Sequence, residues 1–120
     1  MRILFDQGTP VPLRRSLPAH EIVTAFEQGW GTLENGDLLR AAERAGFDAI
    51  VTTDQNLRYQ QNLAQRRLAI LVLLTTDWRL IKLHTGYVEA AVDGLVVGSY
   101  VELEFPPSAT PKVEGLTPAR

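Results

Sequence analysis

The chain has 120 residues, of which 45% are hydrophobic and 22% charged, and its formal net charge is −2. These values predict one globular domain with its own hydrophobic core. The absence of cysteine excludes disulfides, thiol catalysis and thiolate metal sites, and the two histidines are too few for a typical zinc site. No apolar run approaches the roughly 20 residues that span a bilayer, and the N-terminus lacks an export signal. We therefore expect a cytoplasmic protein.

Short apolar segments that are typical of strands alternate along the chain with segments that are typical of helices. Strands are expected at 2–5, 21–26, 47–52, 68–74 and 99–105. Helices are expected within 9–20, 37–45, 53–67 and 78–92. This alternation predicts an α/β fold, a three-layer α/β/α sandwich with a mainly parallel central sheet. We expect the domain to span residues 1–105, followed by a polar, proline-containing tail at 106–120.

Two finer features of the helices can also be predicted. Gly46 follows the helix at 37–45 and is expected to end it, because glycine adopts the left-handed conformation that commonly terminates helices. In the helix at 78–92, an apolar stripe is expected to face the core. The stripe consists of Trp78, Leu80, Ile81 and Leu83.

Three aspartates stand where ligand-binding residues of such folds are found. In open parallel sheets, ligands bind beyond the carboxyl ends of the strands. Asp6 and Asp54 follow the first and third expected strands, and Asp37 opens a helix that leads back to the sheet. We expect the three to share one edge of the sheet. Each also has a local alternative: Asp6 can form an Asx turn, Asp54 can cap the next helix, and Asp37 can stabilise a helix N-terminus by about 0.5 kcal/mol.

Asp54 also resembles the phospho-accepting aspartate of response-regulator receiver domains, which follows their third strand. A receiver needs an acidic pair after the first strand and a lysine after the fifth. This chain has Asp6-Gln7 and Pro106-Pro107 at those places. The receiver is therefore the weaker alternative.

A second resemblance covers residues 2–75. FDQGTP at 5–10 and ENGDLLRAAERAGFDAIVTTDQNL at 34–57 together resemble the PIN-like domains of bacterial operons, which are related to the VapC-type toxin ribonucleases. In those relatives the first strand ends in Asp-Glu-Asn, an acid opens a later helix, and the third strand ends in Thr-x-Asp-x-Asp. Asp6, Asp37 and Asp54 occupy the matching places here.

The resemblance implies metal-dependent RNA cleavage by a toxin with a cognate antitoxin. Clustered carboxylates that bind Mg²⁺ or Mn²⁺ activate water and neutralise charge on the phosphoryl oxygens. The implied catalytic residues are Asp6, Asp37 and Asp54, and the implied metal ligands are the same three together with Asn56.

Two departures from the family pattern leave an alternative function open. Gln7 and Asn56 stand where relatives often carry acids. The missing charges weaken divalent binding, so a non-catalytic PIN-like binding module with an eroded metal site is the alternative. Glu34, three residues before Asp37, is an acid that can compensate.

Candidate nucleic-acid contacts lie near the same sheet edge. Arg14, Arg15 and Arg58 can bind RNA phosphates or serve as solvated surface residues. Trp30 and Tyr59 can stack on bases, although Trp30, set between glycines, is more typical of a loop anchor packed on the core. Because the last strand and the tail are expected to be exposed, we also expect a homodimer or a bound antitoxin.

Overall fold

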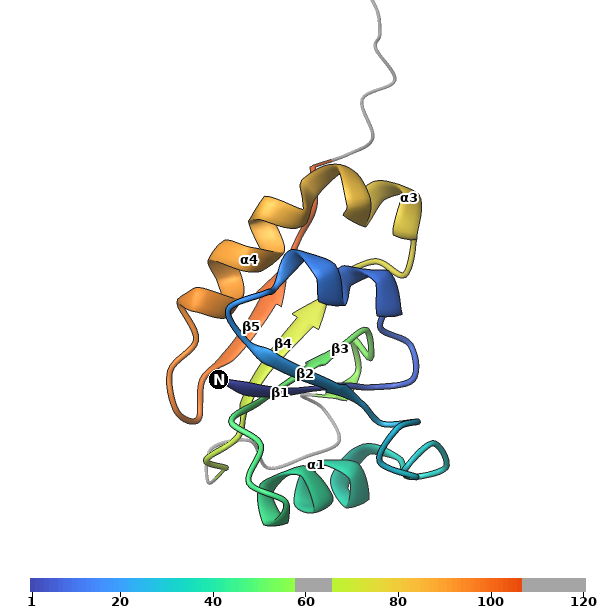
Figure 1. Cartoon of the computed structure of the whole chain (residues 1–120), viewed down its shortest axis with the longest axis vertical. Helices are drawn as coiled ribbons and strands as arrows, with labels where there is room; N and C mark the ends of the chain where they lie inside the picture. Colours follow the sequence, from blue (N-terminus) through green and yellow to red (C-terminus); the bar gives the residue numbers. More distant parts are fainter. Residues whose placement is uncertain (58–65, 107–120) are drawn as a thin grey trace, which may run out of the picture.

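The computed structural model describes residues 1–57 and 66–106. In this part of the chain five strands form one sheet with the order β2-β1-β3-β4-β5, and every neighbouring pair is parallel (Figure 1). The strands are β1 (Arg2–Phe5), β2 (Glu21–Thr24), β3 (Ala49–Thr52), β4 (Ala69–Leu73) and β5 (Tyr100–Leu103). The predicted α/β fold with a parallel sheet is confirmed.

The burial of each strand follows its place in the sheet. Every residue of β3 and β4 is buried, as expected for central parallel strands that are covered on both faces. The two edge strands are less buried, since each β5 residue is half-buried and β2 begins with an exposed glutamate. The apolar run at 68–74 therefore provides an interior strand, β4, which is paired on both sides.

Helices cover both faces of the sheet (Figure 1). They are the 3₁₀ helix η1 (Val11–Ser16), α1 (Asn35–Arg44), α3 (Trp78–Ile81), the 3₁₀ helix η3 (Lys82–His84) and α4 (Thr85–Asp93). On one face, Leu13 of η1 and Val88 of α4 pack in the same cluster as Phe5. On the other face, Leu39 of α1 packs in the cluster of Leu4. The expected helix at 53–67 falls mostly on residues 58–65, which lie outside the described residues.

The predicted end of a helix at Gly46 is confirmed, and the predicted apolar stripe in the segment 78–92 is partly wrong. Gly46 directly follows Ala45, the C-cap of α1, and has a φ of +84°, the left-handed conformation expected after a helix. Ile81 is buried, but Leu83 is 69% exposed. Leu83 lies two residues after the buried Ile81, which places it about 200° around an α-helix or about 240° around a 3₁₀ helix, and in either case away from the core.

The connections between strands do not all have the same hand. The β2–β3 and β4–β5 connections step across the sheet in the same direction, yet α1 covers one face and α4 the other (Figure 1). Two such connections must have opposite hands, and one of them is therefore the rare left-handed form. The short η1 leaves room on its face, and Val88 and Val92 of α4 fill it.

No helix among residues 1–57 and 66–106 has the length and apolar character needed to traverse a lipid bilayer.

Candidate functional site

The strand order reverses between β1 and β3, because β1 connects to β2 on one side and pairs with β3 on the other. Such a switch point opens a crevice at the carboxyl ends of the two strands. Asp6 directly follows β1, and Asp54 follows β3 by two residues. A backbone bond from Asp6 N to Val51 O, at 3.1 Å, joins the strand ends.

Two buried threonine hydroxyls hold the Asp6 carboxylate. Thr9 Oγ1 donates to Asp6 Oδ1 at 2.8 Å, and Thr52 Oγ1 donates to Asp6 Oδ2. Burial raises the pKa of Asp6 above its ordinary value, while the hydrogen bonds from Thr52 and Thr9 act in the opposite direction. Asp6 is therefore a fixed carboxylate whose charge is incompletely compensated by the protein.

Thr52 also connects Asp6 to Asp54. The backbone N–H of Asp54 donates to Thr52 Oγ1 at 3.1 Å, and Asp54 Oδ1 accepts from the backbone N–H of Asn56 at 3.0 Å. The second bond is an Asx turn that orients the Asp54 side chain. Asn56 is exposed and contributes its backbone to this turn.

Asp6 and Asp54 line a common pocket of about 210 Å³. Gln7, Trp30 and Glu34 also line it, together with apolar side chains. A smaller pocket of about 30 Å³ lies against Thr52 and also includes both aspartates. The predicted convergence of Asp6 and Asp54 at one edge of the sheet is thus found in the structure.

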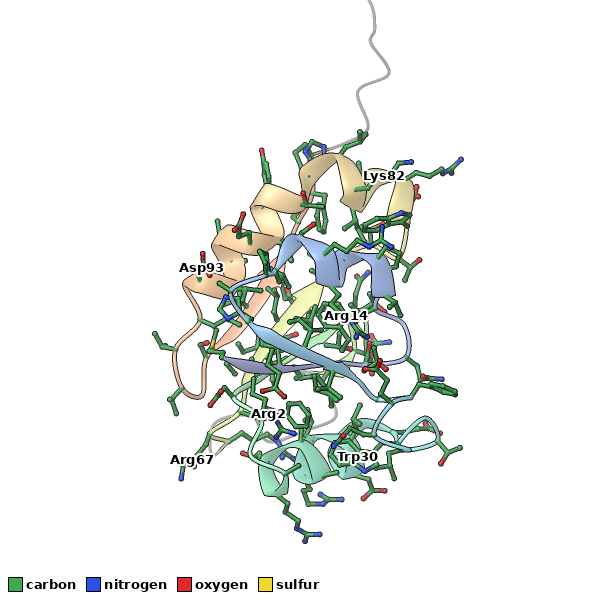
Figure 2. The ribbon with its side chains drawn as sticks, in the orientation of Figure 1. Arg2, Arg14, Trp30, Arg67, Lys82 and Asp93 are labelled. Carbon is green, nitrogen blue, oxygen red and sulfur yellow. The ribbon has the colours of Figure 1, made fainter. Side chains whose placement is uncertain are left out.

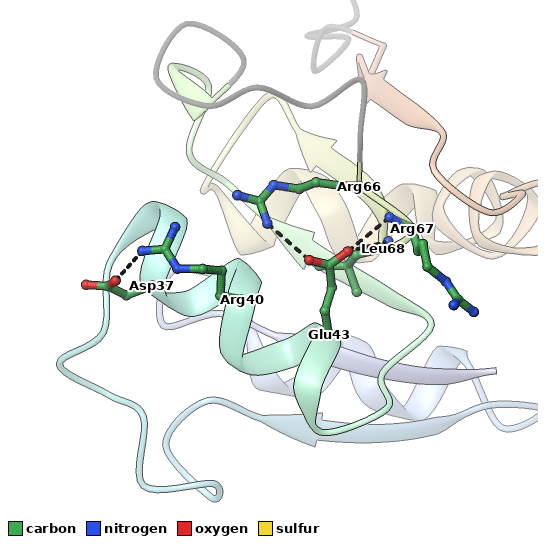
Figure 3. Close-up of polar contacts among 6 residues, drawn as sticks. All are labelled: Asp37, Arg40, Glu43, Arg66, Arg67 and Leu68. Carbon is green, nitrogen blue, oxygen red and sulfur yellow. Dashed lines mark hydrogen bonds and ion pairs between the residues drawn. The ribbon is translucent and has the colours of Figure 1, made fainter.

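Asp37 does not line this pocket. Its carboxylate is 70% exposed at the start of α1 and lies 2.5 Å from the Arg40 guanidinium, one turn later (Figure 3). The acid of this segment that does reach the pocket is Glu34, the N-cap residue of α1. A role for Asp37 as a ligand would require its side chain to leave Arg40.

A divalent cation is compatible with the pocket in one arrangement. Within residues 1–57 and 66–106, no three acidic, histidine or cysteine side chains are arranged to hold a metal ion together. Mg²⁺, however, is commonly bound through one or two carboxylates, with waters and substrate phosphate completing the octahedron. Asp6 and Asp54 provide two such carboxylates.

The expected nucleic-acid contacts have different surroundings. Arg14 lies on the η1 side of the sheet, where it is paired with Glu27 at 3.1 Å, and Arg15 is exposed (Figure 2). Trp30 lies on the α1 side and packs edge-to-face on Phe47, with ring centroids 6.1 Å apart, as a loop anchor would (Figure 2). Arg58 and Tyr59 lie outside the described residues.

Sequence reasoning missed both threonines. Thr9 lies in a Gly-Thr-Pro turn and Thr52 ends an apolar strand. The sequence does show a threonine within three residues of each of the two aspartates at the strand ends, and this feature could have identified both.

No known family model, curated protein or solved structure matches the chain. The side chains around Asp6 are therefore the basis for a functional assignment.

Proposed function

We propose that this protein is a PIN-like domain, a three-layer α/β/α sandwich that binds Mg²⁺ or Mn²⁺ and cleaves RNA as the toxin of a toxin–antitoxin pair. The observation that supports the proposal is the shared pocket of Asp6 and Asp54 at the switch point of a parallel sheet. Two carboxylates from separate strand ends, one of them held by two buried hydroxyls, provide oxygen ligands in a fixed arrangement.

The acidic residues of the pocket and the two threonines beside it have separate roles in this proposal. Asp6 and Asp54 would hold the ion, and Glu34, which lines the same pocket, would add negative charge beside it. A bound ion lowers the pKa of water and neutralises charge on the phosphoryl oxygens. Thr9 and Thr52 keep Asp6 oriented, so the ligand geometry exists before the ion enters.

Basic side chains would position the RNA. The candidate phosphate contacts are Arg14 and Arg15 in η1, together with Arg58, and Arg14 would have to share its guanidinium with Glu27. Their planar guanidinium groups match phosphate oxygens better than lysine does.

A calorimetric Mn²⁺ titration tests the metal site. We expect wild type to bind Mn²⁺ and the Asp6→Asn/Asp54→Asn double variant to lose most of that binding. Glu89→Gln removes an exposed charge on α4 and is the matched control, which should bind as wild type does. Equal Mn²⁺ binding by wild type and the double variant would refute the site, and cleavage of a labelled RNA by that variant would refute its catalytic role.

A second candidate is a PIN-like module that binds RNA without cleaving it. Gln7 lines the pocket without adding charge, and Asp37 is paired with Arg40. Under this alternative, wild type binds RNA but leaves it intact in Mn²⁺. Gln7→Glu adds a carboxylate to the same pocket, and tighter Mn²⁺ binding by this variant would show that the missing charge limits the site.

A further inference from the structure

The outer face of the helical segment 78–93 carries exposed apolar side chains. α3, η3 and α4 follow one another without a gap over these residues, and the inner face of the segment packs on the core through Ile81, Val88 and Val92. On the outer face, Leu83 is 69% exposed and Tyr87 is 49% exposed. Because these two residues are four positions apart, their side chains are neighbours on the helix surface.

Two further residues extend this apolar surface along the segment. Ala90 is exposed about one turn after Tyr87, and the half-buried Leu80 lines a hollow of about 340 Å³ together with Leu83. The ring of Tyr87 packs edge-to-face against His84, with centroids 5.3 Å apart. We name Leu80, Leu83, Tyr87 and Ala90 the outer patch. A group of adjacent exposed apolar side chains is typical of an interaction surface.

The charges beside the outer patch match a second copy of the same surface. Lys82 and Glu89 are seven residues apart, which is about two helical turns, so they lie on the same flank of the segment. Both are exposed, and neither has an ion-pair partner within residues 1–57 and 66–106. When two helices pack antiparallel about a two-fold axis, the same flank of each meets at the interface. Lys82 of each copy then lies opposite Glu89 of the other, and such flanking pairs set the orientation of packed helices.

The ends of the segment have the same polarity but already have partners. Arg79 Nε lies 3.4 Å from Asp77 Oδ1, and Asp93 Oδ1 lies 2.9 Å from His20 Nε2. The outer surface is therefore basic before the patch and acidic after it. A uniformly acidic or uniformly basic partner would place a like charge beside one end, which opposes binding. A second copy in the antiparallel orientation places opposite charges together at both ends.

We propose that this protein forms a homodimer in which the outer patches of two copies pack antiparallel about a two-fold axis, with Lys82 of each copy beside Glu89 of the other. The axis passes midway between these two residues. Each contact then occurs twice, as in other isologous interfaces. The proposal is independent of the nuclease function, because no residue of the outer patch lines the Asp6–Asp54 pocket.

Sedimentation velocity of the full chain over about 1–300 μM tests the proposal, because dimers with small interfaces are typically weak. We expect wild type to shift from monomer to dimer over this range. Lys82→Glu and Glu89→Lys should each weaken the dimer about tenfold or more, since each places like charges together at both symmetric contacts. An equimolar mixture of these two variants should dimerise as wild type does, because every contact between the two different chains again joins opposite charges.

Two more variants separate the outer patch from other surfaces. Arg44→Glu makes the corresponding charge change at an exposed position of α1 and should leave association unchanged. Leu83→Ser removes apolar area from the patch and should weaken the dimer without altering the circular dichroism spectrum, since Leu83 is exposed. A wild type that stays monomeric throughout the range overturns the proposal. A dimer that tolerates both Leu83→Ser and Lys82→Glu also overturns it, because its interface would lie elsewhere. If wild type dimerises but the mixture does not, the antiparallel pairing is wrong.

Discussion

Replacing Thr52 by valine is the sharpest test of how the pocket is held together. Thr52 is 2% exposed, and valine has nearly the same shape. The change removes the hydrogen bond that Thr52 donates to Asp6 and the one that it accepts from Asp54 N. A hydrogen bond to a charged group contributes about 1.5–3 kcal/mol and a neutral one about 0.5–1.5 kcal/mol. We therefore expect Thr52→Val to lower the free energy of unfolding at neutral pH by about 2–4.5 kcal/mol.

The loss of free energy of unfolding caused by Thr52→Val should depend on the charge of Asp6. Burial raises the folded-state pKa of Asp6 above its ordinary value of 3.8, so protonation of Asp6 favours the folded state. This contribution to stability is fully present below 3.8 and is lost as the pH rises through the raised pKa. Thr52→Val removes a bond that lowers the pKa of Asp6, so the pKa rises further. The variant should consequently lose more stability at neutral pH than below 3.8.

Urea unfolding followed by circular dichroism measures these differences. In the Asp6→Asn background the bond to a charged oxygen is absent and only the neutral bond from Asp54 N remains, so Thr52→Val should cost only about 0.5–1.5 kcal/mol there. Thr53→Val makes the same chemical change one residue later. Since the Thr53 hydroxyl has no hydrogen bond within the described residues, this control should stay within about 0.5 kcal/mol of wild type. An equal cost at both pH values and in both backgrounds would show that Thr52 does not act through the Asp6 charge.

The remaining predictions concern other parts of the chain. Gly98 has a φ of +76°, and an added Cβ would lie 2.8 Å from the Arg66 carbonyl oxygen, so we expect Gly98→Ala to cost about 1–3 kcal/mol in urea unfolding. At Gly86 in α4 an added Cβ would meet nothing within 4 Å, so Gly86→Ala should raise the free energy of unfolding by about 0.4–1 kcal/mol. If both substitutions changed the free energy of unfolding in the same direction, the backbone conformation of Gly98 would not be the cause. Asp37→Asn removes a charge that is exposed and paired with Arg40, so the Mn²⁺ affinity measured by calorimetry should not change. Glu34→Gln removes a charge from the pocket and should weaken Mn²⁺ binding. Weaker binding by Asp37→Asn together with unchanged binding by Glu34→Gln would identify Asp37 as the ligand.

The first residues of the chain show how far the sequence alone leads toward the site. An apolar run that ends in an aspartate predicts both β1 and the position of Asp6 at its carboxyl end. Parallel strands align their ends at one edge, so a second aspartate after β3 had to lie near the first. The direction of the Asp37 side chain could not be predicted, because it depends on the competition between the pocket and Arg40, which lies one turn away on the same helix.

By itself, the amino-acid sequence determined the five strands, their parallel arrangement, the end of α1 at Gly46 and the common edge of Asp6 and Asp54. These features follow from local patterning, since alternation of apolar segments and a glycine stop act over a few residues. Only the tertiary structure decided that α4 covers the face of η1 and that Glu34 lines the Asp6–Asp54 pocket. Both depend on surfaces that exist only after distant segments pack, and hydrophobic periodicity carries no information about which face remains open.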